Sequence, residues 1–487
     1  MEKPKEECGV FGIVAKDPSV DVAQIIFRGL MALQHRGQEA AGISVVDSSK
    51  RIHTFRDHGL VFQALKPEIL QKMWGHVGIG HVRYGTAGSG DIRNAQPFHY
   101  ETTQSPPFSL VYNGNITNYQ ILKEELKKKG KIFLTNGDTE VIANIIASNS
   151  LVVKDWIENI EFTAKILDGA FSIVILTNEG DLYAYRSGNK PLCYGTVNLL
   201  NTELYIITSE TSAITSLGGT IIRDLEAGEI IHVHQDHFFH REKLLDVEKH
   251  HCVFEYVYFA RGDSIIDGKS VHRTREKLGK NLAKLDKENG FKYNNAIVVP
   301  VPDSGRSAAL GYAKESGLPY DEGLMKNRYV FRSFIAPSQA ERLNLVRMKL
   351  NPVPSIVKDK EIILIDDSIV RGTTMTRIVK LLRWAGAAKI HVRSSCPPIR
   401  FPCHYGVDFP SSGELIFCQK EIQASSAEET NELICKEIGA DSLTYLTMEG
   451  MIDAVGLPEK DLCTVCWDGN YWYSHEGTKK FLKSGRI

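Results

Sequence analysis

The sequence has no long apolar run, no excess of charge of either sign, and few cysteines for its length. No stretch approaches the roughly 18 apolar residues that a membrane-spanning helix needs. The 58 Lys and Arg residues balance 59 Asp and Glu residues, for a net charge of −1, which argues against a nucleic-acid binder that relies on bulk positive charge. Nine cysteines among 487 residues are too few and too scattered for a disulfide framework. We therefore expect a reducing, cytoplasmic location with thiols available for metal binding or catalysis.

Internal repeats and low-complexity tracts are also missing, which excludes solenoid and fibrous proteins. The first seven residues are charged and contain no apolar segment, so we do not expect a secretory signal. Hydrophobic residues make up 43% of the chain, which is enough to form buried cores. The length is typical of roughly two to four domains.

The pattern of predicted elements changes near the middle of the chain. Up to about residue 240, strands alternate with a few helices, which predicts a layered α+β domain. Within it, Thr117–Gln120 has the pattern of a capping box that opens a helix. The charged, histidine-rich stretch 235–251 predicts a surface connection. Beyond it, strand–loop–helix units at 296–315 and 361–382 predict an α/β domain with a parallel sheet and ligands at the carboxyl ends of its strands.

The loop Ile365–Thr374 has the composition of a phosphate-binding site. It follows a predicted buried strand and opens a helix, and Gly372 allows a close backbone approach. Backbone N–H groups and the serine and threonine hydroxyls can then hold a phosphate at the positive end of the helix. The adjacent carboxylates of Asp366 and Asp367 can hold ribose hydroxyls or Mg²⁺. The alternative is a solvated acidic turn that caps a helix, and the complete pattern favours the phosphate site.

This loop is similar to the ribosyl-phosphate-binding signature of the type I phosphoribosyltransferases. The resemblance implies that the acid pair binds the ribose of phosphoribosyl pyrophosphate (PRPP) and that the following loop binds its 5′-phosphate. It also implies a pyrophosphate loop at Pro302–Arg306 and a cation-rich lid at 326–345 that closes over the substrate and excludes water. The implied PRPP-binding residues are Asp303, Ser304, Gly305, Arg306, Lys326, Arg332, Lys349, Asp366, Asp367, Ser368, Arg371, Gly372, Thr373 and Thr374. The implied Mg²⁺ ligands are Ser304, Asp366 and Asp367.

Cys8 is the candidate nucleophile of the first half. Considered alone, a cysteine in the segment Cys8–Ile13 is more simply a strand residue near a chain end. The functional interpretation requires removal of residues 1–7 as a propeptide, so that Cys8 becomes the first residue. Its α-amino group, with a reference pKa of about 8, could then serve as the base that activates the thiol.

Four further segments favour the functional interpretation. Gln34–Glu39, Gly80–Thr86, Tyr112–Asn115 and Gly137–Glu140 occur in this order. They resemble the glutaminase domain of the N-terminal-nucleophile amidotransferases, which implies an αββα fold over residues 8–240.

The same resemblance implies how glutamine is held. Arg83 would pair with the glutamine α-carboxylate and Asp138 with its α-amino group, and Arg36 would also belong to the glutamine-binding residues. The Asn113 side chain and the Gly114 N–H would form the oxyanion hole. A forked guanidinium suits a carboxylate, and two neutral donors suit an oxyanion that develops on the amide carbon.

Taken together, the two halves resemble the glutamine PRPP amidotransferases, with a type I phosphoribosyltransferase domain and C-terminal extension over 241–487. The family implies conversion of PRPP, glutamine and water to 5-phosphoribosylamine, glutamate and pyrophosphate, the first step of purine synthesis. It also implies homotetramers and inhibition by purine nucleotides. Three alternatives remain: an amidotransferase with another acceptor, a salvage phosphoribosyltransferase with a vestigial glutaminase domain, and a PRPP-sensing regulator. The last would need a DNA-binding module and a basic face, neither of which the sequence has.

The sequence departs from the family pattern at three positions. Phe331 stands in the lid where glycine is usual, and Gly262 replaces a usual proline. Lys190 occupies the place of an arginine, and lysine does not reproduce a forked contact. None of these changes removes a proposed catalytic group, so they affect expectations about rate and regulation.

Four cysteines form a second candidate site. Cys463 and Cys466 form a C-x-x-C pair, which by itself is compatible with half of a zinc ribbon, a redox pair or no site. Together with Cys252 and Cys403 they match the positions that hold a [4Fe–4S] cluster in part of the resembling family. The resemblance therefore implies a cluster with a structural or oxygen-sensing role, because the expected reaction moves no electrons.

Overall fold

A computed structural model of the chain describes residues 8–84, 90–103, 105–199, 201–234, 237–241, 245–327, 350–407, 411–419 and 426–472. For 237–241 it describes the backbone only. Among these residues, no helix is long and apolar enough to cross a membrane.

The first half of the chain contains two antiparallel sheets. The seven-stranded sheet has the order β11-β9-β10-β1-β4-β2-β3. Its strands are β1 (Gly9–Ala15), β2 (Ala40–Val46), β3 (Ile52–His58), β4 (Val77–Arg83), β9 (Cys193–Leu199), β10 (Thr202–Thr208) and β11 (Thr220–Asp224). The six-stranded sheet has the order β13-β12-β8-β7-β6-β5. Its strands are β5 (Phe98–Tyr100), β6 (Phe108–Ile116), β7 (Gly169–Thr177), β8 (Leu182–Arg186), β12 (Glu229–His234) and β13 (His237–Arg241).

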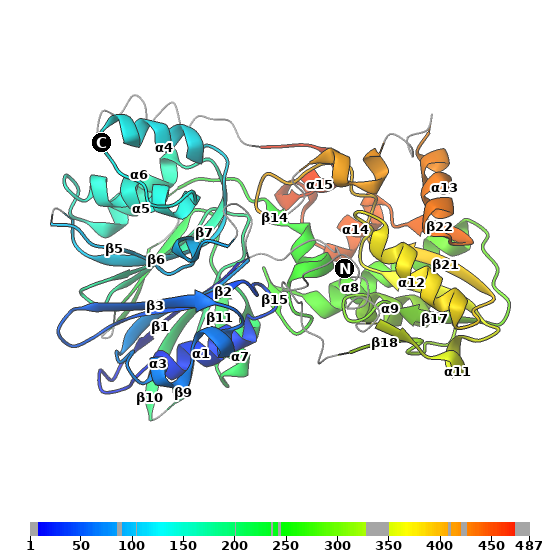
Figure 1. Cartoon of the computed structure of the whole chain (residues 1–487), viewed down its shortest axis with the longest axis horizontal. Coiled ribbons are helices and arrows are strands. Elements are labelled where there is room, and N and C mark those ends of the chain that lie inside the picture. Colours follow the sequence, from blue (N-terminus) through cyan, green and yellow to red (C-terminus); the bar gives the residue numbers. More distant parts are fainter. Residues whose placement is uncertain are drawn as a thin grey trace.

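Helices cover the outer faces of these two sheets, which gives the four-layered αββα arrangement expected from the resemblance (Figure 1). The helices are α1 (Ala23–Ala32), α2 (Val61–Ala64), α3 (Pro67–Leu70), α4 (Tyr119–Lys128), α5 (Asp138–Asn149), α6 (Trp156–Ile166) and α7 (Thr211–Ser216). Between the sheets, Val10 and Val14 of β1 pack with Val111 and Val174 of the facing sheet. Since every residue of β1 is buried, the strand that follows Cys8 is fixed on both faces by apolar contacts.

The second half is built on a four-stranded parallel sheet, as predicted. Its order is β17 (Ala296–Pro300), β20 (Glu361–Asp366), β21 (Lys389–Ser394) and β22 (Ser442–Tyr445). One face packs against α8 (Val271–Glu288), α9 (Arg306–Ser316) and α14 (Met448–Val455). The other face packs against α12 (Thr373–Trp384) and α13 (Ala427–Ile438). The two predicted loops therefore follow neighbouring strands and lie together at the carboxyl ends of the sheet.

Short elements connect the domains and close the second one. A π-helix spans Glu255–Phe259, and 3₁₀ turns lie at Ile92–Asn94, Ser412–Glu414, Ile416–Cys418 and Glu459–Asp461. The remaining short elements are β14 (His251–Cys252), β15 (Ile265–Ile266), β16 (Lys269–Ser270), β18 (Leu324–Lys326), β19 (Leu350–Pro352), β23 (Leu462–Cys463), α11 (Pro354–Val357) and α15 (Val465–Asp468). Strand β14 pairs in parallel with β23, so the C-terminal segment returns to the start of the second half.

Two local predictions were wrong. Helix α4 begins at Tyr119 without a side-chain cap, because the Thr117 hydroxyl donates to the Asp168 carbonyl at 3.1 Å. The stretch 235–251 is not a plain surface connection either: β13 pairs with β12 in the six-stranded sheet, and β14 is buried. Histidine and phenylalanine are compatible with strands, so the polar composition was a poor guide there.

Helices α8 and α9 cross with their backbones in contact. A Cβ added to Gly279 would lie 1.8 Å from the Ala308 carbonyl oxygen, and one added to Gly311 would lie 1.8 Å from the Glu276 carbonyl oxygen. Helix α9 begins at Arg306, the last residue of the predicted pyrophosphate loop, so this crossing fixes where the loop ends.

Because a methyl group at position 279 has no space, we predict that Gly279→Ala destabilises the protein by about 1–3 kcal/mol, measured by urea unfolding. The matched control is Gly262→Ala, since nothing lies within 4 Å of a Cβ there. Equal stability of the two variants would contradict this account of the helix crossing.

Candidate active sites

Cys8 directly precedes β1 and lies beside the last residues of β4, the strand that pairs with β1. Its thiol donates to the Tyr84 carbonyl at an Sγ–O distance of 3.8 Å. The register places Gly9 opposite Val82, so the end of β4 brings Arg83 beside the Cys8 segment. Part of the residue is exposed, but the thiol itself is enclosed by the protein. Residues 1–7 lie outside the described residues, so their predicted removal stays a prediction.

The predicted oxyanion residues follow each other on β6. Asn113 is buried, and its side-chain nitrogen has no hydrogen-bond partner among the described residues. Gly114 has φ +148°, and a Cβ there would lie 2.1 Å from the Ala170 carbonyl oxygen. Only glycine fits at this position. A buried amide donor with no partner is costly unless something else accepts from it.

The predicted glutamine-binding side chains are buried and partnered. Arg83 forms an ion pair with Glu39 at 2.7 Å. Asp138, the first residue of α5, accepts a hydrogen bond from the Tyr112 hydroxyl at 2.8 Å. Burial raises the pKa of the Asp138 carboxyl above its ordinary value. A cation beside it would counter that effect, as the α-amino group of glutamine would do.

Electrostatic coupling shows that these residues lie around one thiol. Burial raises the pKa of Cys8; the positive charges of Arg83 and Arg36 act to lower it, and the charge of Asp138 acts to raise it. The structure therefore brings together Cys8, Arg36, Arg83 and Asp138 from four separate segments. Their roles toward glutamine stay predictions.

Arg36 contacts the main chain of Cys8 instead of extending into open space. Its Nε donates to the Cys8 carbonyl at 3.0 Å. The outer guanidinium nitrogens bind Glu210 at 2.7 Å and Glu255 at 2.6 Å. Glu255 begins the π-helix of the second half, so Arg36 links the two halves directly behind the thiol. Its predicted contact with glutamine is untested.

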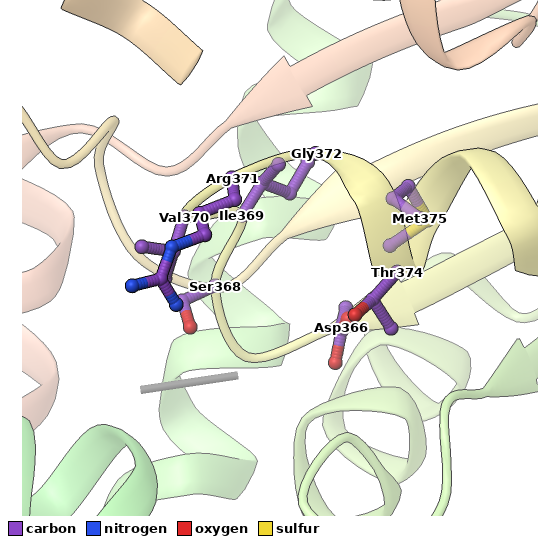
Figure 2. A pocket seen from close by; sticks show the side chains of 8 residues that line it. All are labelled: Asp366, Ser368, Ile369, Val370, Arg371, Gly372, Thr374 and Met375. Carbon is purple, nitrogen blue, oxygen red and sulfur yellow. The ribbon is translucent and has the colours of Figure 1, made fainter. Parts of the chain in front are cut away.

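The loop 365–374 encloses a small cavity at the carboxyl end of β20. Figure 2 shows its lining: Asp366, Ser368, Ile369, Val370, Arg371, Gly372, Thr374 and Met375. Gly372 precedes α12 with φ +73°, and a Cβ there would meet Ile416 at 2.3 Å. The cavity lies at the N-terminus of α12, where backbone N–H groups favour an anion. Sequence reasoning missed Glu414, whose carboxylate accepts from the Arg371 Nε at 2.9 Å.

The acid pair is buried but hydrogen-bonded. Asp366 accepts from the Asp367 N–H at 3.0 Å, and Asp367 accepts from the Ser368 hydroxyl at 2.7 Å. Sequence reasoning also missed Arg275, which is buried on α8 and interacts electrostatically with Asp367. The pair is thus held by hydrogen bonds within its own loop, and the charge of a cation on another element acts on Asp367.

The predicted pyrophosphate loop lies next to this site. Pro300 is the register partner of Ile365, and a Cβ on Gly305 would lie 2.5 Å from the Ile365 carbonyl oxygen. Asp303 forms ion pairs with Lys326 at 2.6 Å and Arg306 at 3.2 Å. The loop that contains Ser304 and the loop that contains Thr373 thus lie side by side at the carboxyl ends of β17 and β20. Arg332, Lys349 and Phe331 lie outside the described residues, as does most of the predicted lid.

The structure gathers the four predicted cluster cysteines from three segments. Cys252 and Cys463 are register partners in the β14–β23 pair. The hydrogen bond from the Cys466 thiol lowers the pKa of Cys403 to about 7. The same hydrogen bond raises the pKa of Cys466, with burial and the charges of Cys403, Cys463 and Cys252 acting in the same direction.

Lys190 lies beside these cysteines. Its side chain is buried, and its Nζ would be 3.2 Å from a Cβ on Gly406. Its positive charge acts to lower the pKa of both Cys403 and Cys463. In the described part of the chain, no three His, Cys, Asp or Glu side chains are grouped so that they could hold one metal ion. A multi-iron cluster makes a different demand, because each thiolate binds a different iron.

Family models match both halves. The glutamine amidotransferase domain model matches residues 86–216, and the phosphoribosyl transferase domain model matches residues 268–398.

Full-length relatives and solved structures match nearly the whole chain. An amidophosphoribosyltransferase of Methanocaldococcus jannaschii is 43% identical, over 95% of this chain and 97% of its own. The Bacillus subtilis amidophosphoribosyltransferase is 41% identical, over 96% and 94%. A structure of the B. subtilis glutamine PRPP amidotransferase complexed with ADP and GMP superposes with a TM-score of 0.85 at 38% identity, covering 96% of this chain and 98% of that one.

Because burial raises the pKa of Cys8, the neutral thiol is favoured and thiolate accumulates only at higher pH. We predict that alkylation of Cys8 by iodoacetamide, followed by peptide mass spectrometry, has its pH midpoint above the ordinary range for cysteine. Arg83→Gln moves the midpoint further upward, because a cation that stabilises the thiolate is lost. A midpoint below the ordinary range would contradict the burial argument.

Proposed function

The chain belongs to the amidophosphoribosyltransferase family, and from this membership we propose how its residues divide the work. It is an enzyme that converts PRPP, glutamine and water to 5-phosphoribosylamine, glutamate and pyrophosphate, the first step of purine biosynthesis. We assign residues 8–240 to glutamine hydrolysis and 241–487 to phosphoribosyl transfer. The alternatives of a salvage transferase and a PRPP-sensing regulator have no observation in their favour.

In the glutaminase half, the Cys8 sulfur attacks the side-chain amide carbon of glutamine. A new S–C bond forms, and the thiol proton passes by way of the Cys8 α-amino group, once residues 1–7 are removed, to the departing ammonia. Water then cleaves the γ-glutamyl thioester and releases glutamate. The oxyanion that forms in both steps accepts from Asn113 Nδ2 and Gly114 N–H.

One observation carries this assignment: the buried Asn113 amide, which has no partner in the described part of the chain, lies on the strand that also presents Tyr112 to Asp138. Arg83 receives the α-carboxylate alongside Glu39, and Asp138 receives the α-amino group. A substrate oxygen at Asn113 would accept the hydrogen bond that its buried amide does not make to any described residue.

In the transferase half, the 5′-phosphate of PRPP binds in the cavity at the N-terminus of α12, and the ribose hydroxyls bind the acid pair. The pyrophosphate contacts Ser304, Gly305 and Arg306 on the adjacent loop. Asp366, Asp367 and Ser304 supply oxygen donors of the kind Mg²⁺ prefers, and the ion would neutralise charge on the leaving pyrophosphate. The lid at 326–345 excludes water from C1 of the ribose.

Ammonia passes between the two sites inside the protein. The described contacts place the halves directly against each other at the oxyanion strand, where the Asn115 side-chain amide donates to the His404 carbonyl at 2.7 Å. We propose that residues 403–406 form part of the wall between the sites. A closed passage keeps ammonia from being protonated in bulk water.

Regulation and assembly follow the relatives. The B. subtilis structure was determined with ADP and GMP, and we propose that purine nucleotides inhibit this enzyme and that it assembles as a homotetramer. A reducing, cytoplasmic location remains a prediction based on its cysteine content.

Cys252, Cys403, Cys463 and Cys466 are proposed to hold a [4Fe–4S] cluster. The fit rests on the convergence of three chain segments and on the hydrogen-bonded Cys403 and Cys466 thiols. The buried Lys190 ammonium suits a site of net negative charge. The cluster would fasten the C-terminal segment to the second domain.

The two half-reactions are separable by mutation. We predict that Cys8→Ala lowers glutamine-dependent synthesis of 5-phosphoribosylamine by about 10³-fold or more, while synthesis from free ammonia continues at the parental rate. Asp367→Asn impairs synthesis from glutamine and synthesis from ammonia alike, because both use the PRPP site in which Asp367 lies. Glutamine-dependent synthesis by Cys8→Ala would overturn the assignment.

Anaerobic purification tests both the cluster and the propeptide. We expect a broad absorption near roughly 400 nm with about four irons per chain, and an intact mass that lacks residues 1–7. Cys466→Ser loses the iron and the absorption, whereas Cys435→Ser, outside the four-cysteine site, keeps them. An iron-free, colourless anaerobic preparation would exclude the cluster, and a full-length mass would exclude processing.

A further inference from the structure

Strand β6 loses its neighbour just before the oxyanion residues. Strand β5 pairs with β6 only from Tyr100↔Phe108 to Phe98↔Leu110. The next residue toward the N-terminus of β5 is Pro97, which has no N–H to donate. The ladder on this side therefore stops before Tyr112, the residue that precedes Asn113.

Two buried side chains replace the missing strand at Tyr112. The Gln96 side-chain oxygen accepts from the Tyr112 N–H at 2.6 Å. His81 lies on β4 in the facing sheet, and its Nε2 is 3.1 Å from the Tyr112 carbonyl oxygen. A carbonyl oxygen only accepts, so the Nε2–H donates. Both peptide units that flank Tyr112 are thus held by side chains.

The state of His81 suits this single task. Its side chain is buried, and burial lowers its pKa to about 3. The imidazole is therefore neutral at physiological pH and carries one proton, on Nε2. Its Nδ1 is buried without a hydrogen-bond partner in the described residues. An apolar residue at this position would leave the Tyr112 carbonyl without this donor, so the Nε2 contact accounts for a buried histidine whose other nitrogen is unsatisfied.

The same contacts connect the three elements around the glutamine site. His81 is two residues from Arg83 on β4. Gln96 also donates to the Thr139 hydroxyl at 3.3 Å, next to Asp138 on α5. The Tyr112 hydroxyl completes the connection at Asp138. Tyr112 is thus the point at which β4, β6 and α5 are joined by hydrogen bonds.

We propose that His81 and Gln96 are positioning residues that hold the peptide units around Tyr112 and so fix the oxyanion donors relative to the residues that bind glutamine. This inference rests on the proposed glutaminase function of Cys8, Asn113 and Gly114. Neither side chain needs to touch the substrate. Their effect follows from geometry, because a displacement of about 1 Å in an active site can cost about 100-fold in rate.

The experiment uses two pairs of variants of the full chain. His81→Gln places a side-chain N–H where Nε2 lies, whereas His81→Met has similar size and no donor. Gln96→Glu keeps the acceptor oxygen, whereas Gln96→Met removes it. For each variant, kcat and KM for glutamine hydrolysis, ammonia-dependent synthesis and the thermal midpoint are measured.

We expect each methionine variant to lower kcat for glutamine about 10- to 100-fold, with a smaller change in KM. Ammonia-dependent synthesis stays within about twofold, because it does not use the oxyanion hole. His81→Gln and Gln96→Glu recover most of the lost kcat. Alkylation of Cys8 by iodoacetamide keeps the parental rate, since that reaction needs no oxyanion donor.

Three outcomes would overturn the proposal: a parental kcat in both methionine variants, equal loss of glutamine- and ammonia-dependent activity, or no recovery in the conservative variants. If His81→Met does not fold, the Gln96 pair decides the question. Failure of the glutaminase assignment itself is recognised separately, because Cys8→Ala would then retain glutamine-dependent synthesis.

Discussion

The buried ion-pair cluster around Arg36 holds the nucleophile and the two domains in one geometry. Arg36 and Glu210 come from the first domain and Glu255 from the second, and all three are almost fully buried. Burial acts to raise the pKa of Glu210, yet His35 and Arg36 lower it well below its ordinary value. The cluster is therefore charged, and the buried Glu255 carboxylate is paired with Arg36 only while the domains stay in contact. Separating the domains would leave Glu255 without this partner, whereas Glu210 would keep Arg36 and His35.

This constraint explains why both sites can rely on rigid elements. Glu210 also accepts from the Ser264 hydroxyl at 2.7 Å and from the Arg261 N–H at 3.0 Å. These contacts fix the segment after the π-helix, while Arg275 binds the Tyr256 carbonyl at 2.7 Å. Arg275 also interacts electrostatically with Asp367, so the buried polar contacts that begin at the Cys8 main chain end on a cation whose charge acts on the acid pair.

The sequence predicted the sites whose functional residues lie close together in the chain. The loop 365–374 and the parallel sheet follow from a strand, a glycine and a helix in sequence, and the Cys8 segment was found from ordered short motifs. It could not find the partners of Arg36, since Glu255 is 219 residues away and in another domain. The roles of His81 and Gln96 depend on the residue at which β5 stops pairing with β6, and no local sequence pattern predicts that residue. The capping-box prediction failed for the same reason, because the Thr117 hydroxyl donates to the carbonyl of Asp168, a residue distant in the sequence.

The parallel pairing of β14 with β23 has a consequence for synthesis on the ribosome. Strand β14 leaves the exit tunnel well before its partner, because the paired residues Cys252 and Cys463 are 211 positions apart in the chain. The first domain already has all strands of its two sheets by Arg241, so it can collapse while the remainder is being made. Cys252 therefore stays in an unpaired strand until Cys463 has been made. A nascent chain halted before Leu462 would expose this strand edge to chaperones.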